Sequence, residues 1–178
     1  QALQLTEMVI ERVKSVFSGI IENTDKFKRM EIALTGLSGS AKTAADDFKF
    51  LIDLSRSAPF SIDALRDAMI RLRSTGIQDT HRTLIALANA VSAFGGSSEE
   101  FKSAVEAIAQ MAGKGVVSME ELRRQLGQRI PQAIVIAARE MGITMQELFK
   151  RVESGQLNSL TFIQHLTEGF EKDFAGAS

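Results

Sequence analysis

The chain has 178 residues and a formal net charge of −1, from 21 Lys plus Arg against 22 Asp plus Glu, so no overall field draws it onto nucleic acid or anionic lipid. It has no Cys and only two His, which excludes disulfides, thiolate catalysis and most zinc sites, and we expect no metal and no cofactor. No signal peptide and no apolar run of about 18 residues is visible, so we expect no membrane segment in this domain.

Apolar residues at helical spacing predict a first helix that ends near Glu22 and a second helix that begins after the break at residues 23–25. We expect residues 1–36 to form an N-terminal helical arm, and residues 37–174 to form a compact helical domain. The apolar stripe of the first helix has to fold back or meet a partner. Because the sequence does not begin with Met, we expect it to be a piece of a longer protein.

Four further helices are predicted between residues 40 and 115. Their starts are marked by Ser40, by Ser61 after Pro59, by Asp79, and by a capping box of Ser97 and Glu100, in which each side chain bonds the other residue's backbone. Gly76 and the pair Gly95 and Gly96 end two of these helices. The residues predicted to be buried are Phe48, Leu51, Ile52, Leu65, Met69, Leu72, Leu84, Leu87, Val91, Phe94, Phe101, Val105, Ile108 and Met111.

The run from Ile108 to Leu157 places several short helices and their end signals close together. Gly113 and Gly115 close one helix, and Ser118 with Glu121 is predicted to open the next as a capping box, with Leu122 and Leu126 on its apolar face.

The second half of this run repeats the pattern. Pro131 starts a helix that Gly142 ends, and Thr144 with Glu147 caps another that contains Leu148, before Gly155. A final helix after Asn158 is predicted to bury Phe162, Ile163, Leu166 and Phe170. Strand alternation is nearly absent and loops are short, so the fold class predicted is all-α, a compact bundle of about eight to nine short helices.

This run resembles the N-terminal domain of tail tape measure proteins of long-tailed bacteriophages and prophages. The resemblance rests on Gly113-Lys114-Gly115, Ser118 to Leu126, Pro131 to Met141, Gly142 to Leu148, and Gly155 to Leu157. Upstream, Ala58 to Asp63 and Leu72 to Gly76 resemble an earlier helix pair of the family, so that the likeness covers residues 36 to 157. Nearly every polar residue of the run has a structural role to fill.

The resemblance implies a structural interaction domain, not an enzyme, that acts in tail assembly and tail length determination. Its implied partners are the tail tube, the tail end, an assembly chaperone or another copy of the chain, met in the host cytoplasm during assembly and then in the virion tail. A chain with so many helix breaks cannot form one extended rod, so we expect it to lie outside the length-measuring segment.

A nucleotide-binding enzyme is one alternative. Residues 36–43 match the phosphate-binding loop pattern except that Ala41 replaces its second glycine, where a Cβ crowds both loop and nucleotide. No alternating βαβ pattern follows. We therefore favour a helix stop and restart, with Lys42 and Thr43 solvated in a first turn.

A peptidoglycan hydrolase is the other alternative, with acidic pairs at Asp46/Asp47, Glu99/Glu100 and Glu120/Glu121. These pairs lie at predicted helix starts, where acids complement the helix dipole in solvent. The chain has no Trp and no Tyr to stack on sugar rings. We favour the structural interpretation of the pairs.

The remaining polar candidates have simple structural explanations. His81 follows the Asp79 cap and His165 lies on a helix flank, so neither is predicted to bind a metal. Arg123, Arg124 and Arg129 could contact phosphates, but we predict that they form the solvated face of an amphipathic helix.

Overall fold

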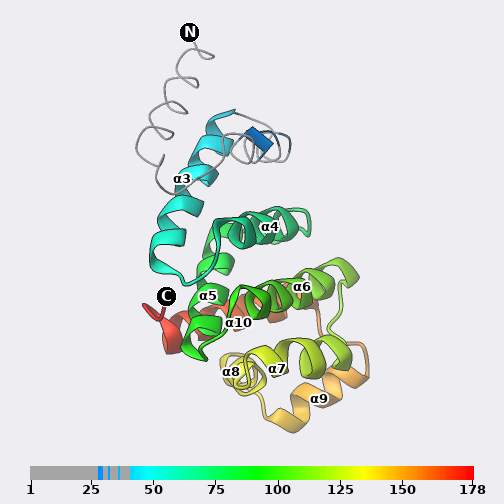
Figure 1. Cartoon of the computed structure of the whole chain (residues 1–178). Coiled ribbons are helices and arrows are strands. Elements are labelled where there is room, and N and C mark those ends of the chain that lie inside the picture. The colour runs from blue at the N-terminus through cyan, green and yellow to red at the C-terminus, as the bar shows by residue number, and fades with distance from the viewer. Residues whose placement is uncertain (1–27, 30–31, 33–35, 37–40) are drawn as a thin grey trace. The chain divides into compact units, whose positions relative to one another are not determined.

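A computed structural model describes residues 28, 29, 32, 36 and 41–178, and within this part of the chain the regular secondary structure is helical (Figure 1). The predicted all-α class is therefore confirmed. The chain divides into two units, Gln1–Leu54 and Ser55–Ser178. The first predicted helix and the apolar positions of the second lie outside the described residues, so the arm predicted for residues 1–36 stays a prediction.

Most helices of the described part begin and end close to where the sequence places them. In chain order they are α3 (Ala41–Ser57), α4 (Ile62–Arg73), α5 (Thr80–Ala93), α6 (Ser98–Lys114), the π-helix η1 (Glu120–Leu126), α7 (Gly127–Arg129), α8 (Ala133–Glu140), α9 (Met145–Glu153) and α10 (Ser159–Phe174).

The predicted helix starts are held by side-chain caps. At each of four starts the capping oxygen accepts from the backbone N–H three residues on, and these caps are Ser61, Asp79, Thr144 and Asn158. The capping box of Ser97 and Glu100 is complete. The hydrogen bonds that Ser97 donates to Glu100 also lower the pKa of this carboxyl below its ordinary value.

Gly142 ends α8 as predicted, with a left-handed φ of 68° that a side chain would strain. The N–H groups of Gly142 and Ile143 donate to the carbonyls of Arg139 and Ala138, both at 3.0 Å, which satisfies the last turn of the helix. The start of α8 differs from the prediction, because Pro131 lies in the preceding turn and the helix begins at Ala133.

The predicted capping box of Ser118 and Glu121 is wrong. Glu121 is only 1% exposed and its carboxylate pairs with Lys114, at the end of α6, instead of turning back to the backbone of Ser118. Within residues 41–178, the Ser118 hydroxyl has no hydrogen-bond partner. The segment that follows is the π-helix η1, whose start at Met119 has no side-chain cap among these residues.

The core of the second unit lies where α10 packs against α5, α6 and α8, and where α6 packs against α4 and η1 (Figure 1). Its largest fully buried side chains are Phe101, Phe162, Phe170, Leu65, Met69, Leu72, Leu84, Leu87 and Ile108. The prediction that Phe94 is buried is wrong. Phe94 follows the last residue of α5 and is 40% exposed, with its ring edge against Phe174. The other apolar positions predicted between residues 40 and 115 are buried.

Replacing Gly169 by alanine is expected to lower the free energy of unfolding by about 1–3 kcal/mol, because it overpacks the contact between α10 and α8. An added Cβ would lie 2.1 Å from Cγ2 of Ile136 and 3.0 Å from Cγ of Glu140, and Ile136 is only 2% exposed. Gly113→Ala is the matched control, since no atom lies within 4 Å of its Cβ position in α6. There alanine should raise stability by about 0.5–1 kcal/mol. Urea unfolding measures the change in the free energy of unfolding for each variant. A change of the same sign in both would contradict this packing.

Candidate functional site

The ends of the predicted family motif meet in space. The N–H of Val117 donates to the carbonyl of Leu157 at 3.0 Å, and the N–H of Ser159 donates to the carbonyl of Gly115 at 3.1 Å. These two bonds tie the end of α6 to the start of α10 and close residues 115–159 into one module. Inside this module Leu122, Leu126 and Leu148 are fully buried. Among the motif residues, Gly115 and Gly142 thus occupy turns, Thr144 a cap, and the three leucines packing positions.

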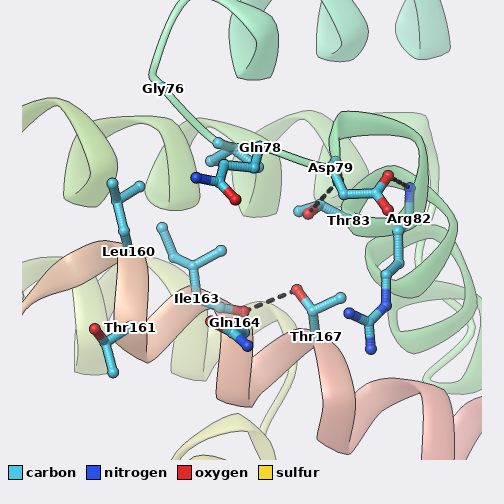
Figure 2. Close-up of a pocket in the computed structure, with 11 residues that line it drawn as sticks. Gly76, Gln78, Asp79, Arg82, Thr83, Leu160, Thr161, Ile163, Gln164 and Thr167 are labelled. Atoms are coloured by element: carbon cyan, nitrogen blue, oxygen red, sulfur yellow. Dashed lines mark hydrogen bonds between the residues drawn. The ribbon is translucent and has the colours of Figure 1, made fainter.

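A groove lies between the turn before α5 and the first turns of α10, and Figure 2 shows the side chains that line it. Its volume is about 310 Å³. One wall is the turn with Ile77 and Gln78, and the other is α10, with Leu160 exposed and Ile163 buried. We call this hollow the α5–α10 groove. Its volume lies at the lower end of the range of small-molecule pockets, about 300–1,000 Å³.

The charged side chains and two threonine hydroxyls of the α5–α10 groove are already engaged within the fold. Asp79 caps α5, and Arg82 forms two bonds to Glu171 at 2.6 and 2.7 Å, which raise the pKa of this guanidinium. The Thr83 hydroxyl donates to the carbonyl of Asp79 at 2.9 Å, and Thr167 donates in the same way to Ile163 (Figure 2). The groove therefore presents apolar surface, neutral amides and two charged groups that are already bonded, and no catalytic acid and base face each other across it.

The acidic pairs considered for catalysis differ in their exposure and in their partners. Asp47 and Glu121 are each only 1% exposed, so the prediction of solvated carboxylates is wrong for these two. Glu99 pairs with Lys102 at 3.1 Å, and Glu100 belongs to the capping box.

The structure describes only part of the segment that resembles a phosphate-binding loop, residues 36–43. Residues 37–40 lie outside the described residues, and Lys42 and Thr43 are exposed in the first turn of α3.

The two histidines lie on different helices. His165 is half-buried, with Nδ1 3.7 Å from Glu168, and His81 is half-buried at the start of α5. No cluster of three potential metal ligands occurs among the residues that the structure describes. In that same part of the chain, every helix is too short or too polar to cross a lipid bilayer.

The predicted basic face is not uniformly solvated. The Arg123 guanidinium lies 4.3 Å from the ring centroid of Phe149, and Arg124 is 3.5 Å from Glu120 at the surface. Arg129 is half-buried, and in the described part of the chain its Nε has no partner. The solvated-face prediction is therefore wrong for Arg129.

Comparison with known proteins gives consistent matches. The family model described as tape measure protein matches residues 18–178. Over 74 residues the chain is 38% identical to the probable tape measure protein of Salmonella phage Felix O1, an alignment that covers 42% of this chain and 10% of that protein. Over 165 residues it is 27% identical to the Mu-like prophage FluMu protein gp42 of Haemophilus influenzae, covering 92% of this chain and 26% of that protein.

These matches confirm the family resemblance on which the sequence analysis relied. The chain spans about a tenth of the first relative and about a quarter of the second. No solved structure matches the chain significantly.

Proposed function

The chain belongs to the tape measure protein family, and we propose that it is a structural interaction domain of a phage or prophage tail protein, acting in tail assembly. The observation that carries the proposal is the family match over residues 18–178, most of the chain. The domain would contact other tail components, namely the tube, the tail end, an assembly chaperone or a second copy, and would reach the virion tail after assembly in the host cytoplasm. It acts without catalysis and without a cofactor.

The arrangement of the second unit supports a role as a contact domain and not as a length-measuring rod. Within residues 55–178 the longest helix, α6, has 17 residues, and residues 115–159 close on themselves through main-chain bonds. A short-helix bundle of this kind cannot contribute rod length at about 1.5 Å per residue.

The α5–α10 groove is the surface that we assign to one such contact. Leu160 is 43% exposed on its rim, and burying an apolar side chain of a partner there would remove both from water. The exposed amide of Gln78 flanks this apolar strip and can bond to the partner's backbone, as can the carbonyl oxygen of the Gln164 amide, whose NH₂ donates to Glu168 at 3.3 Å.

In-frame removal of residues 55–178 from the full-length tail protein tests the proposal. The expected result is loss of assembled tails in electron micrographs of lysates, because the contacts that organise assembly are missing. A normal number of tails would contradict the proposal. So would a normal number of shorter tails, reduced by about 1.5 Å for each removed residue, because that result belongs to a helical ruler.

A further inference from the structure

A second hollow lies between α6 and the segment formed by η1 and α7, on residues that the proposed contact does not use. Its volume is about 400 Å³. Lys102, Glu106 and Gln110 of α6 form one side, and Arg124, Gln125 and Arg129 form the other. We call it the basic groove, since its lining holds three cations and one carboxylate.

The charges of the basic groove are unequally compensated. Glu106 already pairs with Arg71 and accepts from the Gln110 amide at 3.0 Å, so its carboxylate is satisfied. Lys102 pairs with Glu99 at 3.1 Å in solvent, and Arg124 has only a loose contact with Glu120. The positive charge left over is therefore concentrated on the side formed by η1 and α7.

Among the three cations of the basic groove, Arg129 is the one with a buried donor that has no partner within residues 41–178, and the Gln125 Oε1 beside it on the lining is a buried acceptor without one. Arg129 is half-buried, and within residues 41–178 it has no salt bridge and no hydrogen bond from its buried Nε. Its interaction with Glu100 acts only through space. A buried donor without an acceptor destabilises the free domain, so an incoming acceptor would recover that free energy on binding.

We propose that the basic groove binds a carboxylate side chain, Asp or Glu, from an acidic segment of a partner protein, with Arg129 and Arg124 as donors. A planar guanidinium fits a carboxylate through two parallel hydrogen bonds, which a neutral amide cannot match. This inference rests on the proposed function, because it gives the chemistry of one partner.

A protein carboxylate fits this groove better than a nucleic-acid backbone. Glu99, Glu106 and Glu120 surround the cations and would repel an extended row of phosphates, whereas one carboxylate can reach the Arg side without approaching them. The hollow of about 400 Å³ also suits one side chain better than a duplex.

The test is a titration of the purified 178-residue chain, labelled with ¹⁵N, with a capped peptide of alternating Glu and Ala. The expected result is a saturable shift of the Arg129 Nε–H signal, which is absent when Gln replaces every Glu of the peptide. Arg129→Gln should weaken binding about tenfold, as loss of a charge-assisted pair does. Arg129→Lys keeps the charge but not the planar fork, and should weaken it less; this variant decides the matter if Arg129→Gln does not fold.

Arg123→Gln is the matched control, because it removes the same charge from the segment formed by η1 and α7, but from a side chain that stacks on Phe149. Equal weakening by both substitutions, equal binding of the Gln peptide, or tighter binding of a DNA duplex with the same dependence on Arg129 would each overturn the proposal. If the peptide does not bind but removal of residues 55–178 abolishes tails, the groove assignment fails and the proposed function stands.

Discussion

Phe101→Ala is expected to lower the free energy of unfolding by about 3–5 kcal/mol, among the largest losses that one substitution in this chain can cause. Phe101 is fully buried in α6, and its ring stacks on Phe60 with centroids 4.6 Å apart and planes 12° apart. Alanine would leave a cavity between α6 and the segment before α4. Because Phe60 is only 4% exposed, the surrounding chain has little room to collapse into that cavity.

Phe94→Ala is the matched control for that substitution. Phe94 is 40% exposed and keeps one edge contact with Phe174, so its loss should cost less than about 1 kcal/mol. Thermal unfolding followed by far-UV circular dichroism compares the two variants. At about 2–4 °C for each kcal/mol in a domain of this size, Phe101→Ala should melt well below Phe94→Ala. Equal melting temperatures would show that the core is not centred on α6.

Two sequence segments with the same capping-box pattern show when a local pattern predicts the structure correctly and when it does not. Ser97 with Glu100 and Ser118 with Glu121 have the same spacing, yet only the first forms a capping box. Glu121 is drawn inward because Lys114, at the end of the preceding helix, pairs with its carboxylate. A capping-box pattern covers only four consecutive residues. It therefore cannot include Lys114, which the turn between α6 and η1 brings close to Glu121.

The buried stripes were predictable because they depend on helical spacing alone, as Leu65, Met69 and Leu72 show in α4. Phe94 fits the same spacing but lies beyond the last turn of α5, where the helix has passed the core. Helical periodicity gives the face of a residue but not its position along the packed length, so this error could not be avoided from sequence.

The α5–α10 groove had no signal in the sequence. Its walls come from Ile77 and Leu160, which the folding of α4, α5 and α10 brings together over a long sequence separation. Ile77 lies between α4 and α5, and Leu160 in the first turn of α10 stays 43% exposed although Ile163, three residues on, is buried. Apolar residues that stay exposed are a cue for contact surface, but they do not reveal which other segment completes it.

Leu160→Asp in the full-length tail protein is expected to block tail assembly while leaving the domain folded. Leu160 is 43% exposed in the first turn of α10, where a carboxylate is compatible with the helix dipole. Placed on the rim of the α5–α10 groove, the new charge would have to lose its hydration when an apolar partner side chain enters. The melting temperature of the variant chain should stay close to that of the natural chain.

Val135→Asp is the matched control, because Val135 is 55% exposed in the first turn of α8 and does not line the α5–α10 groove. The most direct measurement is a count of tails by electron microscopy in lysates of phage or prophage that carry each substitution. We predict few or no tails for Leu160→Asp and normal numbers for Val135→Asp. Normal tails from a folded Leu160→Asp protein would contradict the claim that this domain serves tail assembly through the α5–α10 groove.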